Sequence, residues 1–171
     1  MVLTGSPGGG KTTVLSALQR RGHRVAADSA REIIRTRRHA GLSPRPPPLA
    51  FAEAVLQRDV QQHAELSGAP GLVFFERGVV DALGMLSALG ALPDARRRAL
   101  LGTCHYRRQV FLFPGWEAIY ATDDERDQTF AQAAAVAPAA AQWYRRCGYD
   151  VVEVPRAGVD ERCEFILRAL S

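Results

Sequence analysis

Near the start of the chain stands the stretch that decides its fold, Gly5-Ser6-Pro7-Gly8-Gly9-Gly10-Lys11-Thr12. The apolar run 1–3 comes before it, and apolar residues with helical spacing follow it at 14–18. A strand, a glycine-rich turn and a helix with the spacing G-x-x-x-x-G-K-T are typical of a phosphate-binding loop. Glycines let the backbone N–H groups turn toward a polyphosphate, and the helix presents its positive end to the same anion. The stretch therefore predicts a strand–loop–helix unit that binds a nucleotide through the residues from Gly5 to Thr13.

The lysine and the threonine of the loop have separate predicted roles. Lys11 is expected to reach the β- and γ-phosphates of ATP and to act in catalysis, and the Thr12 hydroxyl is expected to bind Mg²⁺. Of the 22 Lys and Arg residues in the chain, only Lys11 is a lysine. Because a compact ammonium suits a point contact among phosphate oxygens, this unequal usage supports the assignment.

Length and composition indicate a globular protein with one domain, residues 1–171. A chain of 171 residues with 47% hydrophobic and 23% charged residues is long enough for one substantial core and short for two. No apolar run approaches the roughly 20 residues that span a bilayer, and no basic-then-apolar leader precedes the loop. Three irregularly spaced cysteines, Cys104, Cys147 and Cys163, indicate free thiols in a reducing compartment. We therefore expect a cytoplasmic protein without a membrane partner.

The net charge of +4 and the isoelectric point near 9.3 fit a polyanionic ligand. The two arginine clusters, at 35–38 and 96–98, lie in helical patterns without interleaved aromatic residues. Such clusters favour solvated helix faces over a nucleic-acid surface. Nucleic acid is therefore not the expected partner.

Five apolar segments of strand length alternate with segments of helical pattern. The expected strands are 1–3, 24–27, 72–75, 109–113 and 150–154. The expected helices run from the loop to 21, from 29 onward, and over 49–66, 79–89, 93–101, 128–146 and 160–170. Ser29 is expected to cap the helix that it opens, and Pro138 to kink or divide its helix. This alternation predicts an α/β fold with a doubly wound parallel sheet.

Parallel sheets of this kind bind ligands at the carboxyl ends of their strands, so the residues that follow the strands are candidates. Asp28 is expected to orient or deprotonate an acceptor hydroxyl or to bind the metal through water, with a helix cap as its alternative role. Glu76 holds the position of a metal-binding acid, with a cap of the next helix as its alternative role. Arg77 is expected to hold the acceptor or a phosphate, or to pair with a surface acid. Phosphoryl transfer requires this combination of phosphate loop, metal, carboxylate and positive charge.

Five stretches of the chain resemble the nucleoside and nucleotide kinase branch of the P-loop proteins, and more closely the small AAA-domain ATPases related to the ribosylnicotinamide kinase domain: 5–13, 25–34, 73–81, 107–128 and 152–167. The resemblance implies the three-layer P-loop NTPase fold, with five parallel strands in the order 2-3-1-4-5 and helices on both faces. Glu76-Arg77 is similar to the Glu-Arg of deoxynucleoside kinases and the Asp-Arg of thymidylate kinases. Asp28 stands where deoxynucleoside kinases carry a catalytic carboxylate.

The resemblance also implies a lid and an adenine site. The segment 114–127 is similar to the lid of these kinases, and its one arginine, Arg126, is expected to reach the γ-phosphate during catalysis. Pro155 and Arg156 resemble the turn that packs on adenine. The chain departs from the family pattern at Gly78, where a Ser or Tyr often follows the arginine. No acceptor-specificity motif is recognisable, and the acceptor wall is expected within 40–63, with candidates Phe51, Glu53, Gln57 and Arg58.

Two classes of function stay open. The chain contains no Asn, which excludes the Asn-Lys-x-Asp guanine signature of GTPases. No apolar run ends in the Asp-Glu pair that is typical of mechanical ATPases, and 171 residues leave no room for a second AAA-type lid domain. One open class is a kinase that transfers the γ-phosphate of Mg-ATP to a nucleoside, nucleotide or similar small acceptor near Asp28, Arg31 and Arg77. The other is a regulatory nucleotide-binding module that acts through a protein partner. Acceptor-stimulated turnover distinguishes the two.

Overall fold

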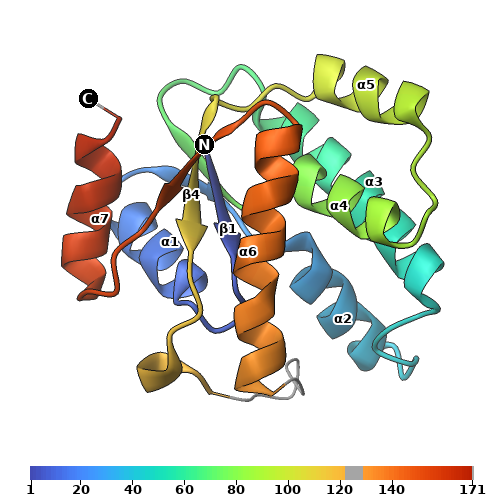
Figure 1. The fold of residues 1–171 in the computed structure, drawn as a ribbon, viewed down its shortest axis with the longest axis horizontal. Coiled ribbons are helices and arrows are strands. Elements are labelled where there is room, and N and C mark those ends of the chain that lie inside the picture. Colours follow the sequence, from blue (N-terminus) through green and yellow to red (C-terminus); the bar gives the residue numbers. More distant parts are fainter. Residues whose placement is uncertain (122–128, 171) are drawn as a thin grey trace.

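The computed structural model describes residues 1–121 and 129–170 and is built around one parallel sheet (Figure 1). Its strands are β1 (Val2–Gly5), β2 (Arg24–Ala26), β3 (Val73–Glu76), β4 (Gln109–Phe113) and β5 (Asp150–Glu153). They lie in the order β2-β3-β1-β4-β5, and each neighbouring pair is parallel. The predicted α/β sheet and its predicted strand order are confirmed.

Helices cover both faces of the sheet, as expected. They are α1 (Lys11–Arg20), α2 (Ser29–His39), α3 (Pro48–Leu66), α4 (Val79–Ala88), α5 (Asp94–Thr103), the short 3-10 helix η1 (Glu117–Ile119), α6 (Phe130–Arg146) and α7 (Val159–Arg168). In Figure 1, α1 and α7 lie on one side of the strands, and α3, α4 and α6 lie on the other. Among the residues that the structure describes, no helix has the length and apolar content that a membrane crossing needs.

The sheet has a hydrophobic core on each face, because adjacent residues of a strand point in opposite directions. Leu3 and Phe74 pack in the core formed with α1 and α7. Their strand neighbours Val2 and Phe75 pack in the core formed with α3, α4 and α6. Burial on both faces is the physical reason that the central strands are continuous apolar runs in the sequence.

Asp28, and not Ser29, caps α2. The Asp28 carboxylate Oδ1 accepts hydrogen bonds from the backbone N–H groups of Ala30 (2.9 Å) and Arg31 (3.4 Å). The Ser29 hydroxyl instead donates to Asp59 Oδ1 of α3 at 2.5 Å. Position 28 precedes the first helical residue, so its side chain reaches the free N–H groups of the first turn, whereas position 29 is already helical. The expected Ser29 cap is wrong.

The helix α6 runs unbroken through Pro138. Proline has no N–H to donate to the carbonyl four residues earlier, which belongs to Ala134. The Ser6 hydroxyl of the glycine loop donates to Ala134 O at 3.5 Å. The loop thus supplies a donor where the helix lacks one. Of the two expected effects of Pro138, the division of the helix is wrong and the kink stays a prediction.

Candidate active site

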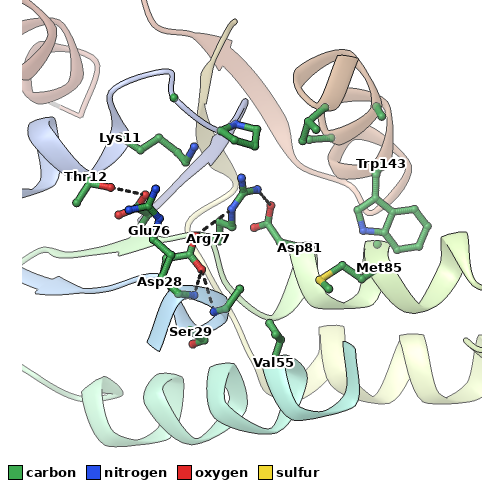
Figure 2. A pocket seen from close by; sticks show the side chains of 18 of the residues that line it. Lys11, Thr12, Asp28, Ser29, Val55, Glu76, Arg77, Asp81, Met85 and Trp143 are labelled. Atoms are coloured by element: carbon green, nitrogen blue, oxygen red, sulfur yellow. Dashed lines mark hydrogen bonds and ion pairs between the residues drawn. The ribbon is translucent and has the colours of Figure 1, made fainter. Parts of the chain in front are cut away.

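Residues that are far apart in the sequence meet at the carboxyl ends of β2, β3 and β1, because these strands are neighbours in the sheet. The glycine loop, Asp28, Glu76 and Arg77 line one cavity of about 1380 Å³. Figure 2 shows three groups of side chains along it: Lys11 and Thr12; Asp28, Arg77 and Asp81; and Met85 and Trp143. The cavity therefore joins the glycine loop to a second region between helices.

The backbone of the glycine loop adopts left-handed conformations that glycine allows. The φ angles of Gly5, Gly8 and Gly10 are 115°, 76° and 84°, values that other residues rarely adopt. A Cβ at Gly5 would lie 2.2 Å from Phe113 O of β4. The helix α1, which the structure describes completely, begins after Gly10 with no side-chain cap and no acidic residue in its first turn. Its first N–H groups and its positive end are thus available to an anion.

Lys11 is a buried cation that forms no ion pair within the described part of the chain. It is 4% exposed, and its Nζ donates hydrogen bonds to the backbone carbonyls of Ser6 (2.7 Å) and Gly5 (3.4 Å). Burial and the charge of Arg77 lower the pKa of Lys11 to about 7, although nearby carboxylates oppose the shift. An anionic ligand beside this buried, unpaired ammonium would stabilise its charged form.

Thr12 and Glu76 bring two oxygen atoms together at the start of α1. Thr12 Oγ1 donates to Glu76 Oε1 at 2.9 Å, and Glu76 is buried. A hydroxyl beside a carboxylate fits Mg²⁺, which takes few protein ligands and completes its shell with water and phosphate oxygens. No group of three or more His, Cys, Asp or Glu side chains arranged to hold a metal occurs among the described residues. The pair therefore suits a cation that arrives with a nucleotide.

Arg77 lies next to the glycine loop, between two acids. Its Nη2 donates to Gly5 O at 2.9 Å, its Nε lies 3.3 Å from Asp28 Oδ2, and its Nη1 lies 3.4 Å from Asp81 Oδ1. Burial disfavours the charge of Arg77, but the surrounding carboxylates outweigh burial and raise its pKa. A φ of 66° puts Arg77 in the left-handed region, and strain of this kind in a non-glycine residue clusters at functional sites.

Asp81 belongs to the site although no sequence motif marks it. Besides Arg77, it accepts hydrogen bonds from the hydroxyls of Thr4 (2.5 Å) and Tyr144 (2.6 Å). It therefore ties β1, α4 and α6 to Arg77. The signal in the sequence is its position four residues after Arg77 in the first turn of a helix, where an acid also stabilises the helix start.

Arg162 of α7 is a second residue that sequence motifs leave unmarked. It is 4% exposed, its Nη1 donates to Gly9 O at 3.1 Å, and its guanidinium carbon lies 5.4 Å from the centre of the Trp116 ring. Arg162 Nε is the one buried side-chain nitrogen or oxygen atom without a hydrogen bond in the described part of the chain. Burial lowers the pKa of Arg162. The only signal in the sequence is a charge on the buried face that Cys163 and Ile166 also occupy.

The two residues predicted for the adenine site, Pro155 and Arg156, do not line the cavity. Arg156 is exposed, and its Nε donates to Gly115 O at 3.1 Å. The cavity is lined by Arg162 and by neither Pro155 nor Arg156, as far as the structure describes the chain. The adenine role of Pro155 and Arg156 stays a prediction. The expected lid is described only over 114–121, where Ile119 lines the cavity, and Arg126 lies outside the described residues.

The far end of the cavity lies between α3, α4 and α6, so its wall extends beyond the expected range 40–63. The lining residues there are Phe51, Val55, Gly84, Met85, Ala88, Ala139 and Trp143. Of the four candidates, Phe51 is among them. Glu53 instead pairs with Arg96, Gln57 is exposed, and Arg58 pairs with Glu32 and Glu65. The sequence could not identify α4 and α6 as walls, because the contact depends on how distant helices pack.

Comparisons with known proteins agree with this architecture. A family model described as an AAA domain matches residues 1–162. No sequence match was found among curated proteins. The structure is similar to deoxyadenosine kinase from M. mycoides with bound dATP, at a TM-score of 0.67 and 11% identity, with 99% of this chain and 97% of that chain covered. It is also similar to the YorR protein of Bacillus subtilis in complex with phosphorylated GDP, at a TM-score of 0.61 and 11% identity over 99% and 94% of the two chains. At this identity the likeness shows a shared fold.

Proposed function

Because the chain belongs to the AAA-domain family whose model it matches and has the fold of P-loop nucleotide kinases, we propose that it is an ATP-dependent phosphotransferase. It transfers the γ-phosphoryl group of Mg-ATP to a hydroxyl or phosphate oxygen of a small nucleoside-like or nucleotide-like acceptor. One observation carries the proposal: the cavity of about 1380 Å³ is lined by the glycine loop, by Asp28 and Arg77, and by residues of α3, α4 and α6. Pockets for a single small ligand are usually about 300–1000 Å³, so this cavity has room for a donor and an acceptor.

The donor binds at the glycine loop. Residues 5–13 and the first turn of α1 offer backbone N–H groups to the phosphates, and Lys11 contacts the β- and γ-phosphates. Arg162, buried against Gly9 without an acidic partner in the described residues, adds a second cation. Thr12 and Glu76 hold Mg²⁺, which neutralises charge on the phosphates.

The acceptor oxygen lies near Asp28 and Arg77. It attacks the γ-phosphorus, the bond to the β-phosphate oxygen breaks, and ADP leaves. When the acceptor is a hydroxyl, Asp28 takes its proton, and Arg77 contributes positive charge beside the transferring group. The cap role of Asp28 leaves this chemistry possible, since Oδ1 faces the α2 backbone and Oδ2 faces Arg77. Arg126 completes the charge on the γ-phosphate from the lid.

ADP production tests the proposal. The purified chain is incubated with Mg-ATP alone and with a panel of nucleosides, nucleoside monophosphates and small hydroxyl metabolites, with Lys11→Ala as the inactive control. A kinase releases ADP faster with its acceptor. An equal rate of ATP hydrolysis with and without every acceptor contradicts the proposal and favours a regulatory nucleotide-binding module. Equal turnover by Lys11→Ala and the wild type contradicts the assignment of the loop.

A further inference from the structure

The wall of the cavity contains a buried acid to which the proposed reaction gives no role. Asp59 of α3 lines the cavity. The apolar side chains of Val55, Met85 and Trp143, from three helices, line it too. Asp59 is 4% exposed. Buried carboxylates are normally paired with a cation or satisfied by several hydrogen bonds, because burial of an unpaired charge is costly.

Asp59 has a single hydrogen-bond partner within the described part of the chain. Its Oδ1 accepts from the Ser29 hydroxyl at 2.5 Å. Its Oδ2 has neither a hydrogen bond nor an ion pair with the described residues. Oδ2 is not fully buried, because Arg162 Nε is the one fully buried side-chain nitrogen or oxygen atom without a hydrogen bond among those residues. Oδ2 therefore faces the cavity that Asp59 lines.

The charges around Asp59 are mostly negative. Burial raises its pKa to about 7, Asp81 and Asp28 add to the shift, and the Ser29 hydroxyl and Arg77 oppose it. The buried Tyr106 hydroxyl is a further titratable group near it. Above pH 7 Asp59 is ionised and can only accept hydrogen bonds. An acceptor-only or anionic group opposite it would then leave two acceptors facing each other, whereas an N–H group would satisfy Oδ2.

We propose that Asp59 selects the phosphoryl acceptor by accepting a hydrogen bond from an amine or N–H group of the acceptor. This inference rests on the proposed function and names the acceptor class of the same site: an aromatic compound that carries both an acceptor oxygen and an amine. The reacting oxygen lies near Asp28, the ring lies against Val55 and Met85, and the amine faces Asp59. The bond between Ser29 and Asp59 fixes the acid close to Asp28, because Ser29 is the next residue in the chain.

A purely structural role does not account for Asp59. A tie between α2 and α3 requires one acceptor for the Ser29 hydroxyl, and a neutral amide would provide it without a buried charge. The carboxylate leaves a second oxygen unsatisfied at a cavity wall, and buried acids of this kind concentrate at functional sites.

The experiment uses two pairs of nucleosides whose members differ only in the exocyclic amine: adenosine with purine riboside, and cytidine with pyrimidin-2-one riboside. Their affinities for the full chain are measured by isothermal titration calorimetry for the wild type, Asp59→Asn and Asp59→Ala. The asparagine variant keeps an acceptor for Ser29. The matched control is Glu53→Gln, which removes a carboxylate from the same helix outside the cavity. Thermal melting verifies that each variant folds.

In the wild type, at least one amine-bearing nucleoside is expected to bind about tenfold tighter than its amine-free partner, the usual effect of a hydrogen bond to a charged group. That preference falls below about threefold in both Asp59 variants and persists in Glu53→Gln. A preference that survives in folded Asp59→Asn and Asp59→Ala overturns the proposal, and so does an absence of binding by both amine-bearing nucleosides. ADP production measured in parallel separates the two proposals. If nucleoside binding depends on Asp59 but no ADP is released, only the kinase activity is refuted. If an acceptor stimulates ADP release equally in the wild type and the Asp59 variants, only the selection by Asp59 is refuted.

Discussion

Replacing Arg162 by methionine separates a functional from a structural role for this buried cation. Methionine keeps an unbranched stem against Trp116 and the glycine loop but removes the charge and all five N–H donors. If Arg162 serves the nucleotide, the variant should lose ATP affinity without losing stability. If Arg162 serves only to hold α7 on the loop, the variant should lose stability first.

The expected stability change is small or positive. The substitution removes one hydrogen bond, from Arg162 Nη1 to Gly9 O at 3.1 Å, and a bond from a charged donor contributes about 1.5–3 kcal/mol to folding. It also removes an unpaired Nε and a cation that has no acidic partner in the described residues, and relief of this desolvation offsets a loss of that size. Because 1 kcal/mol shifts the Tm by about 2–4 °C in a chain of this length, we expect a Tm without nucleotide that equals the wild-type value within about 3 °C or exceeds it.

The expected loss of ATP affinity is larger. A charge-assisted bond to a phosphate contributes about 1.5–3 kcal/mol, which corresponds to a rise in Kd of about tenfold to a hundredfold. Calorimetric titration with Mg-ATP measures this change, and Arg21→Met is the matched control. Arg21 pairs with Asp160 and Glu164 of α7 at 2.9 Å each, so its loss alters the same helix outside the cavity. A wild-type Kd for ATP in Arg162→Met, together with a Tm lowered by more than about 5 °C, would refute the reasoning.

The remaining expectations concern Lys11, Asp28 and Arg126. Without nucleotide the pKa of Lys11 is about 7, and bound phosphates raise it, so ATP binding above pH 7 takes up a proton and weakens as the pH rises. Calorimetry with EDTA at pH 8, in two buffers of different ionisation enthalpy, measures this proton uptake. Equal heats of binding in the two buffers contradict it. Asp28→Asn preserves an α2 cap and is expected to lower kcat by about 10²–10⁴ with an unchanged Kd for ATP; a loss of ATP affinity with intact acceptor affinity reverses its role. Arg126→Ala is expected to lower kcat more than it raises the KM for ATP, and a wild-type kcat at saturating acceptor leaves Arg77 or Arg31 as the catalytic arginine.

Local chemistry made the glycine loop and the sheet predictable. The left-handed φ angles at Gly5, Gly8 and Gly10 are a property of glycine itself, so the spacing of a few neighbouring residues is enough to indicate the loop. The central strands are apolar at successive positions because both faces of each are buried. The strand order came from the resemblance of whole stretches to a known family. Asp28 and Glu76 were identifiable because each follows a strand, and strand ends meet in a parallel sheet.

Interactions between distant elements decided the rest. The sequence alone determined a phosphate-binding loop, a parallel α/β sheet and the acids and arginine at its strand ends, because short-range backbone geometry and periodic burial fix them. Only the tertiary structure decided that Asp81 would join Thr4 and Tyr144, that Arg162 would lie against Gly9, and that Asp59 would meet Ser29 and line the cavity. Each of these contacts spans helices or strands that are remote along the chain. The sequence pattern of one helix specifies which of its residues are buried, but the packing of two helices specifies what a buried charge meets.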